Sequence, residues 1–356
     1  MELAAQLDDA GTRSADAVAR LWRAGELSAK KDGIGVYKVP LCLAVSGQHG
    51  LANNALDEIV ASLQRSPGVF APPPLPDGVV SPDKVTNLLS EYRTYFDAVI
   101  LAGACATQRW DIVSDAAIAE LLSRQHGPTG GFMKKAGDAN PLMALSVTCM
   151  TGMVLIARGR IAEARRAAAF VQRVIAANGD PSRATHFRFV GTADGGVVTV
   201  PTAWLAARCL FEVDVTSKAN RFYHVGISAA FLAELHALTK EASLLKSAEA
   251  ALTFAERLPA AATACDHICK VGWGAALVYR ETGNPRWAAL ASKVARETFL
   301  GKQQLGGLYP DFVSVMSDEV PVPHEVIGPG TEIAAEFSYE MHFIARGLSA
   351  PARAKL

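Results

Sequence analysis

The chain has 356 residues, of which 50% are hydrophobic and 20% are charged, and this balance excludes a disordered protein. Its 35 basic and 35 acidic residues give no net charge and form no long block of one sign, which argues against a nucleic-acid partner or an anionic membrane surface. No uncharged apolar run reaches the roughly 18 residues of a transmembrane helix, so we expect no membrane span.

The N-terminal sequence, MELAAQLDDAG, is acidic and lacks the basic start and apolar run of a secretory signal. The six cysteines are dispersed, and most lie in apolar runs, where a free thiol behaves as a small hydrophobic group. We therefore expect a cytoplasmic protein without a disulfide framework. A homo-oligomer is a possible assembly.

Helical periodicity dominates from the start of the chain. An amphipathic pattern predicts a helix from about Ser14 to Leu27, and Ser14 or Asp16 is its expected N-cap. Residues 1–13 are predicted to form an N-terminal tail.

A two-helix pattern then recurs five times. In each copy an apolar helix ends in small residues and a polar turn, and a second, amphipathic helix follows. The copies span 41–63, 99–122, 150–175, 229–258 and 272–300, and their second helices open at Leu51, Trp110, Ile161, Leu244 and Trp287. A helix that is apolar all round is buried, whereas one with a charged stripe faces water. The pattern therefore predicts five pairs of inner and outer helices.

The two remaining helices complete the scheme. A last apolar helix, residues 331–348, has no outer partner after it, and the helix at 14–27 has no inner partner before it. Pairing these two helices closes a ring of six hairpins. An open solenoid would need a polar repeat at each end, and the sequence shows none. We predict an all-α fold, an α/α toroid (six-hairpin barrel) forming a single domain over 14–348, with a C-terminal tail at 349–356. Residues 185–201, β-branched around a glycine turn, predict a small β-hairpin insertion.

Two stretches, LLSRQHGPTGGF and FLGKQQLGGLY, share a further pattern: an aliphatic or aromatic pair, then Gln, Gly-Gly and an aromatic residue. This pattern resembles the repeat of terpenoid cyclases and protein prenyltransferases, which are α/α toroids. It is carried by Leu121, Leu122, Gln125, Gly130, Gly131 and Phe132, and by Phe299, Leu300, Gln303, Gly306, Gly307 and Tyr309. Glycine permits a left-handed turn, and the glutamine amide is expected to satisfy free carbonyls at the helix end.

The chain departs from this resemblance in its chemistry. An Asp-rich motif like that of squalene-type cyclases is absent from the inner helices. Protein prenyltransferases bind zinc through Asp, Cys and His, and the stretch ACDHICKVGWG contains all three. However, Cys265 and Cys269 are four residues apart, and His267 lies off that face of a helix. We therefore predict no metal and no cofactor.

Candidate site residues lie where the inner helices begin, because the cavity of a toroid opens at that end. There an apolar helix becomes polar, as an enclosed pocket with a few converging polar groups requires. The candidate catalytic residues are Tyr95, Asp97, Tyr223, His224, Asp266, His267 and Glu336. The candidate substrate-binding residues are Tyr92, Arg93, Phe222, Lys270, Trp273, Glu332 and Tyr339.

Several candidates have a purely structural alternative. Glu332 and Asp266 fall in first helical turns, where the helix dipole favours a carboxylate, and Tyr95 is also compatible with simple packing. Asp97 is harder to explain in this way, because it interrupts the apolar run YFDAVILAGA. An unpaired carboxylate there would be costly or would lose its charge, which favours a functional role.

The sequence shows no Gly-rich phosphate loop, dinucleotide fingerprint or G-x-S-x-G elbow. Acids, histidines and tyrosines in an apolar ring favour metal-independent acid–base chemistry on an apolar small molecule. The main hypothesis is therefore a cyclase, isomerase or lyase of secondary metabolism, acting on a terpenoid or polyketide-like compound. One alternative is a six-hairpin carbohydrate-active enzyme, a glycoside hydrolase or sugar epimerase, that uses paired carboxylates such as Asp97 with Asp266 or Glu336. Another is a non-catalytic helical binding scaffold with a filled centre.

Overall fold

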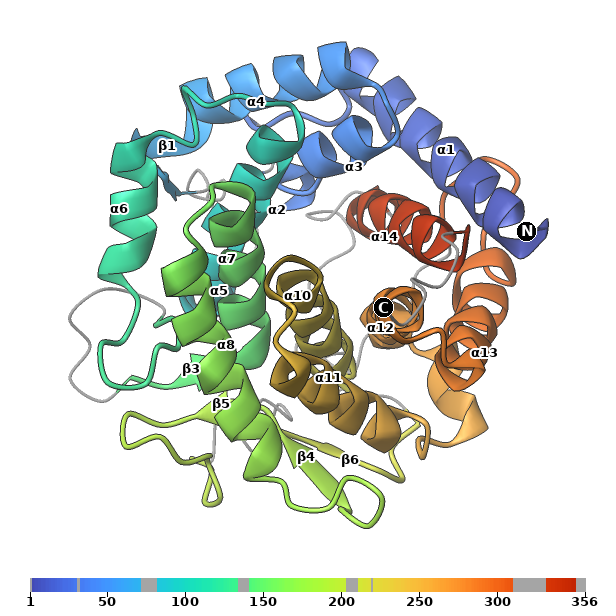
Figure 1. The fold of residues 1–356 in the computed structure, drawn as a ribbon. Coiled ribbons are helices and arrows are strands. Elements are labelled where there is room, and N and C mark those ends of the chain that lie inside the picture. The colour runs from blue at the N-terminus through green and yellow to red at the C-terminus, as the bar shows by residue number, and fades with distance from the viewer. Residues whose placement is uncertain are drawn as a thin grey trace.

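The computed structural model describes residues 2–30, 33–71, 82–133, 141–202, 211–218, 220–309 and 331–349, without the side chains of 33–34 and 82–92. These residues form two concentric rings of helices, so the predicted α/α toroid is confirmed (Figure 1). The inner ring contains α3 (Val39–Val45), α5 (Pro82–Ala106), α7 (Leu145–Ala157), α10 (Tyr223–Thr239), α12 (Cys269–Thr282) and α14 (Thr331–Ser349). The outer ring contains α4 (His49–Leu63), α6 (Asp115–Ser123), α8 (Ile161–Ala176), α11 (Ala242–Ala255), α13 (Pro285–Val294) and α1 (Glu2–Arg23). Short α2 (Gly33–Val36) precedes α3, and α13 continues into a π-helical turn, η3 (Ala295–Leu300).

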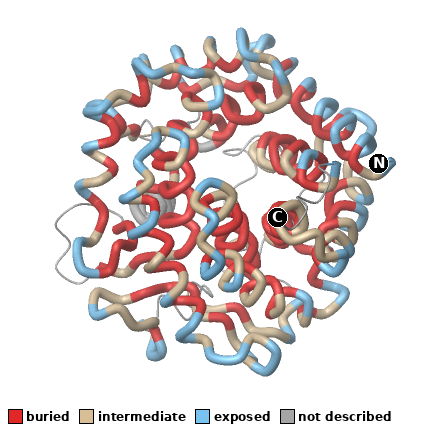
Figure 2. The backbone as a smooth tube through the Cα atoms, in the orientation of Figure 1, coloured by how far each residue is buried: buried red, intermediate tan, exposed pale blue. Residues whose placement is uncertain are grey.

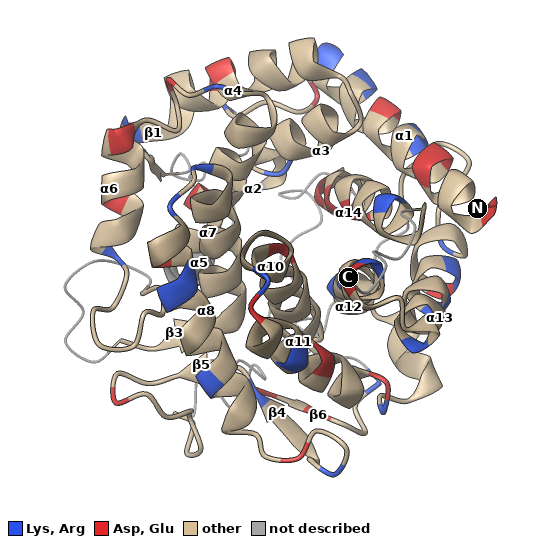
Figure 3. Ribbon diagram, in the orientation of Figure 1, with Lys and Arg blue, Asp and Glu red and all other residues tan. Residues whose placement is uncertain are grey.

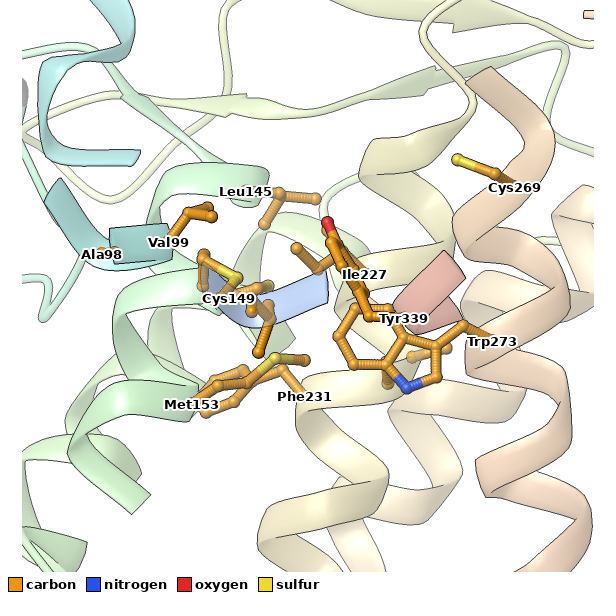
Figure 4. Packing of buried hydrophobic residues seen from close by; sticks show 14 of the residues in the cluster. Ala98, Val99, Leu145, Cys149, Met153, Ile227, Phe231, Cys269, Trp273 and Tyr339 are labelled. Atoms are coloured by element: carbon orange, nitrogen blue, oxygen red, sulfur yellow. The ribbon is translucent and has the colours of Figure 1, made fainter. Parts of the chain in front are cut away.

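The two rings differ in burial as the sequence pattern predicts. In α7 every residue from Leu145 to Leu155 is buried, whereas the outer helices bury one face and expose the other (Figure 2). Apolar side chains of α5, α7, α10, α12 and α14 meet inside the ring (Figure 4). No helix in the described ranges is long and apolar enough to cross a membrane.

The N-terminal helix corrects two boundary predictions. Helix α1 begins at Glu2, and Leu7 and Ala10 are fully buried, so the predicted tail at 1–13 is wrong. Ser14 lies inside α1 and is not its cap. These residues are helical because α1 packs along α14, which closes the ring and covers their apolar side chains. The extent of the single domain stays a prediction, and residues 350–356 lie outside the described ranges.

One outer helix also starts later than predicted. Trp110 lies in the turn before α6, which begins at Asp115. The physical reason is the cap: the Ser114 hydroxyl accepts a hydrogen bond from the Ala117 N–H and so fixes the start of the helix.

The C-terminal copy of the glutamine–glycine motif fastens α1 to the ring. The Gln303 amide donates to the Ala10 carbonyl (2.7 Å) and accepts from the Arg13 guanidinium (2.8 Å). Gly307 has a φ of +83°, and a Cβ there would lie only 2.3 Å from the Arg13 carbonyl oxygen. Glycine is therefore required both by the backbone conformation and by the close approach of α1.

The earlier copy makes the same contacts with α8. The Gln125 amide donates to the Glu163 carbonyl (3.0 Å) and accepts from the Arg166 guanidinium (2.6 Å). A Cβ on Gly130 would lie 2.3 Å from the Arg166 carbonyl oxygen. Each motif thus joins the end of one outer helix to the next outer helix through its glutamine, and Gln125 also donates to the Gly130 carbonyl in its own turn (3.1 Å). The repeated contact identifies α1 as the outer helix of the sixth hairpin.

The predicted hairpin at 185–201 is present only in part. Gly191 bridges to Val197 across a turn. The strands themselves pair elsewhere, β4 (His186–Arg188) with β6 (Glu212–Asp214) and β5 (Val190–Gly191) with β3 (Met143–Ala144). A third small sheet joins β1 (Gln64–Ser66) and β2 (Val69–Phe70). This segment packs against the helical ring through two buried aromatic residues. Phe187 contacts Phe254, and Phe189 stacks on His224.

Two glycines bring α10 and α12 into backbone contact. A Cβ on Gly226 would lie 2.1 Å from the carbonyl carbon of Lys270, and one on Gly274 would lie 2.4 Å from the Gly226 oxygen. Larger residues would separate the helices. The contact places the first turns of α10 and α12 side by side, and both turns carry polar residues.

Candidate active site

Three glutamates run along one face of α14 at the end where this helix begins. Glu332, Glu336 and Glu340 are spaced by four residues, so they stack on consecutive turns. Their side chains are 21%, 14% and 0% exposed. The row therefore leads from a partly exposed position into the interior. Figure 3 shows acidic residues at the end of α14 that faces the middle of the ring.

Two buried lysines alternate with these glutamates. The Lys38 ammonium group, just before α3, binds Glu332 and Glu336. The Lys270 ammonium group, in the first turn of α12, binds Glu336 and also Glu340, the latter at 2.9 Å. We call these five residues the Lys–Glu ladder. It holds three carboxylates and two ammonium groups, and it joins the starts of α3, α12 and α14.

The ladder keeps its lysines charged. Burial lowers the pKa of Lys38 and of Lys270, but the neighbouring carboxylates outweigh burial and raise both pKa values above the usual range, Glu332 acting on Lys38 and Glu340 on Lys270. At the inner end, Glu340 Oε2 is buried and has no hydrogen-bond partner among the described residues. The Cys269 thiol, which lies beside Glu340, is only a weak donor.

Tyrosines line the ladder. The Tyr37 hydroxyl donates to Glu332 Oε1 (3.2 Å), and Tyr95 and Tyr339 interact electrostatically with Glu340. Burial raises the pKa of all three tyrosines, so each keeps its proton and remains a donor at neutral pH.

His224, in the first turn of α10, is fully buried and neutral. Its Nδ1 accepts from the Ser146 backbone N–H (3.2 Å), which assigns the ring proton to Nε2. Burial, and then Arg221, lower its pKa well below the usual value. The ring stacks on Phe189 with centroids 3.7 Å apart. Its Nε2–H is buried and has no partner in the described structure.

His267 lies in η2 (Asp266–Ile268), just before α12. Its Nε2 is 3.9 Å from Asp266 Oδ2, whereas Nδ1 is buried and has no partner within the described ranges. Burial lowers the pKa of His267 although Asp266 opposes the shift, so this ring is also unprotonated near neutral pH. The Tyr223 ring lies 4.4 Å from His224 and 5.1 Å from His267. The two histidines therefore flank one tyrosine.

The histidine pair adjoins the Lys–Glu ladder. The Lys270 ammonium group lies 5.9 Å from the centre of the Tyr223 ring, as the contact between α10 and α12 at Gly226 requires. One turn after Lys270, Trp273 stacks on Phe343, and its buried indole N–H has no described partner. Figure 4 shows the Trp273 ring directed into the interior beside Tyr339.

Five of the nine buried side-chain polar atoms that lack a partner in the described structure belong to these residues and to Ser146. They are Ser146 Oγ, His224 Nε2, His267 Nδ1, Trp273 Nε1 and Glu340 Oε2, and the other four belong to Asn53, Arg158, Arg188 and His342. Buried polar groups are normally paired, because an unmade hydrogen bond costs about 1–3 kcal/mol. A ligand that offers both donors and acceptors would satisfy them.

Most predicted site residues meet in this region. They are Tyr95, Tyr223, His224, Asp266, His267, Lys270, Trp273, Glu332, Glu336 and Tyr339. Phe222 is a fully buried residue that precedes α10, and the Tyr92 side chain lies outside the described residues. Arg93 acts on Asp97 and is not part of the ladder.

Asp97 has a structural environment, and its part in catalysis stays a prediction. Its Oδ1 accepts from the Phe70 N–H (2.8 Å), and its Oδ2 binds the buried Arg124 guanidinium (2.6 Å). Burial raises the pKa of Asp97 to about 6, although Arg124 opposes the shift. Tyr95, two residues earlier, acts on the ladder, and residues two apart on a helix face different directions. The proposed pairing of Asp97 with Asp266 or Glu336 is therefore not observed.

Sequence reasoning missed Tyr37, Lys38 and Ser146. Lys38 carries the signal that identified the others, a charged residue at the start of an apolar inner helix. Ser146 could not be found, because it orients His224 through its backbone N–H.

Two groups of side chains have metal-ligand composition. Cys265, Asp266 and His267 are consecutive, and Cys269 groups with Glu336 and Glu340. Cys265 and Cys269 thus fall in different groups. In the second group the Lys270 ammonium binds both carboxylates and takes the place that a cation would occupy.

A separate cavity of about 150 Å³ lies between α8, α11 and β4, away from these residues. Its lining is mostly apolar and includes Ile175, Phe187 and Phe254, with Lys246 as its charged member. Because it contains none of the unpartnered polar atoms, it does not change the location of the candidate site.

No family model matches the chain, and no curated protein matches it in sequence. Several solved structures, however, are similar in fold. A D-mannose isomerase superposes with a TM-score of 0.59 at 9% identity, covering 86% of each chain. The unsaturated glucuronyl hydrolase of Bacillus sp. GL1 gives 0.56 at 13% identity, covering 98% of this chain and 100% of that chain. A family 76 α-mannanase of Bacteroides thetaiotaomicron gives 0.53 at 14% identity, covering 88% and 85%.

The fold is that of six-hairpin α/α-toroid enzymes. At these identities the likeness shows the fold alone. The neighbours act on carbohydrates, and charged side chains occupy the starts of the inner helices. Both findings contradict the main hypothesis of a terpenoid or polyketide-like substrate in secondary metabolism. The resemblance to terpenoid cyclases and protein prenyltransferases therefore extends to the toroid and not to the chemistry.

Proposed function

We propose that the protein is a carbohydrate-active enzyme that isomerises or epimerises a sugar by proton transfer at the histidine pair. The observation that carries the proposal is the pair itself: two neutral histidines, His224 fully buried and His267 half-buried, flank Tyr223, and each has one buried nitrogen without a partner in the described structure. His224 offers an N–H at Nε2. We place the His267 ring proton on Nε2, the nitrogen that faces the Asp266 carboxylate, so that Nδ1 offers a lone pair.

These two roles suit the chemistry of a carbon acid next to a carbonyl group. His267 Nδ1 takes the proton from the carbon beside the carbonyl, and the nearby Asp266 carboxylate stabilises the imidazolium that forms. His224 Nε2–H donates to the carbonyl oxygen as negative charge develops there. The proton then returns from His267 to the former carbonyl carbon while the hydroxyl proton passes from O2 to O1 through His224, which gives an aldose–ketose isomerisation. Return of the proton to the opposite face of C2, after the enediolate has turned over in the site, gives an epimer. The lowered pKa of His267 keeps its lone pair free at neutral pH.

The hydrolase alternative has less support. Glycoside hydrolysis needs one carboxyl group as an acid and a second as a base or nucleophile, about 5–10 Å apart. Here Glu336 and Glu340 both bind Lys270, and Asp97 binds Arg124, so none of the three is available as the acid. A non-catalytic scaffold has less support, because it gives no role to the buried polar atoms without partners in the described structure.

Proton nuclear magnetic resonance in D2O tests the proposal. Aldoses and ketoses incubated with the protein are expected to exchange the C2 proton for deuterium and to form the isomer. His267→Gln should reduce the rate by about 100-fold or more, in line with the loss of a general base. His236→Gln is the matched control, because His236 lies near the other end of α10 and contacts the Glu241 carbonyl. Release of reducing ends from oligosaccharides without exchange at C2 would instead support the hydrolase.

A further inference from the structure

The Lys–Glu ladder bears on which sugars the site accepts. We propose that Glu340 selects uncharged sugars, by accepting a hydrogen bond from a sugar hydroxyl at Oε2, and that the ladder excludes uronates and sugar phosphates. This inference rests on the proposed function for the presence of a sugar, and it adds the charge class of the substrate.

Both lysines of the ladder are already committed. Lys38 binds Glu332 and Glu336, and Lys270 binds Glu336 and Glu340. Three carboxylates therefore face two ammonium groups, and one negative charge is left over. Each ammonium group already binds two carboxylates, so an anionic substrate group that reached its remaining N–H would do so against the net negative charge of the ladder.

The innermost carboxylate of this negatively charged ladder also carries an acceptor without a partner in the described structure. Glu340 Oε2 is buried, and only a donor satisfies it. A sugar hydroxyl donates, whereas an ionised carboxylate or phosphate oxygen only accepts. The Trp273 N–H, one turn along α12 from Lys270 and also without a described partner, requires an acceptor, and a second hydroxyl serves as one. A neutral polyhydroxy compound thus meets both demands.

The burial of Glu340 increases the difference in affinity between neutral and anionic sugars. Side-chain exposure falls from 21% at Glu332 to 0% at Glu340, so a group that reaches Glu340 leaves water. At about 5 Å and an effective dielectric constant near 20, repulsion between two unit charges is enough for roughly a 100-fold loss of affinity. On the histidine side, Arg221 and Asp266 carry opposite charges, and Arg221 binds the Tyr223 hydroxyl (3.1 Å).

Calorimetric titration with D-mannose, D-mannuronate and D-mannosamine tests the inference, because the three probes share a configuration and differ in charge. We expect D-mannuronate to bind roughly 10- to 100-fold more weakly than D-mannose, and D-mannosamine to bind no more weakly than D-mannose. Glu340→Gln should reduce the gap between D-mannose and D-mannuronate to less than about threefold, whereas Glu340→Asp, which keeps the charge, should preserve it.

Glu332→Gln is the control for position. It removes the same charge eight residues away, about 12 Å along α14, and should retain most of the gap. Should Glu340→Gln fail to fold, the wild-type comparison still decides.

D-Mannuronate binding as tightly as D-mannose, with deuterium still exchanging at C2, overturns the charge inference and leaves the proposed function standing. Absence of binding by all three probes, together with absence of exchange in the sugar panel, overturns both.

Discussion

Asp97 offers the sharpest separation of stability from function. At pH 8, above its pKa of about 6, the Asp97 carboxylate is ionised and pairs with Arg124, whose side chain is only 4% exposed. Asp97→Asn keeps the shape of the side chain and removes its charge. The variant leaves the Arg124 guanidinium buried beside a neutral group.

The magnitude follows from what remains around Arg124. Breaking a buried ion pair by removing one partner costs about 3–5 kcal/mol. Glu120 still binds Arg124 (3.0 Å), and an asparagine oxygen can still accept from the Phe70 N–H. Both contacts reduce the destabilisation. We therefore expect the free energy of unfolding to fall by about 3 kcal/mol, the lower end of that range.

Urea denaturation followed by circular dichroism measures this loss, and deuterium exchange at sugar C2 measures activity per folded molecule. We expect activity within about twofold of the wild type, because Asp97 does not contact the Lys–Glu ladder or the histidine pair. The double variant Asp97→Asn, Arg124→Gln should be less destabilised than the sum of the single variants, since it removes both charges. A stable Asp97→Asn protein that has lost exchange activity would refute the reasoning.

Three further predictions concern pH, packing and ring closure. Because the pKa of His224 lies below its usual value in the folded protein, the unfolded chain binds the proton more readily, and stability should fall as pH drops below about 6.5, by up to roughly 1.4 kcal/mol per pH unit; His224→Gln should flatten the profile measured by urea denaturation. Gly226→Ala places a Cβ against the Lys270 backbone and should lower the free energy of unfolding by about 3 kcal/mol; an unchanged urea midpoint would contradict the close contact. Gln303→Ala breaks the contact with Ala10 and should cost about 1–2 kcal/mol, with faster amide hydrogen exchange in α1 as its local signature.

The two rings could be predicted from the sequence because the apolar or amphipathic pattern of each helix indicates whether that helix is buried. A helix such as α7, apolar on every side, has to be inside, and a helix such as α8, with Arg165 and Arg166 on one face, has to be outside. Closure depended on pairing the first and last helices, which their composition also indicated. The start of α1 was misplaced because its first turns are rich in charge and small residues, and α14 provides their burial.

The site could be predicted only where its residues carry a local signal. His224, Asp266 and Glu332 stand out as polar residues that open apolar helices. Asp97 has the same appearance, but its partner Arg124 is 27 residues away, and no local pattern reveals the pairing. The neutrality of the histidines and the alternation of the Lys–Glu ladder depend on contacts between helices that are distant in sequence.

The most direct measurement is a crystal structure of the His267→Gln variant with the linear polyol D-mannitol, which mimics an open-chain hexose without its carbonyl group. The account predicts the polyol at the starts of α10, α12 and α14, with a hydroxyl within hydrogen-bond distance of Glu340 Oε2 and another near His224 Nε2. A polyol in the cavity between α8 and α11, or a centre filled by side chains that pair all the atoms now without partners, would contradict it.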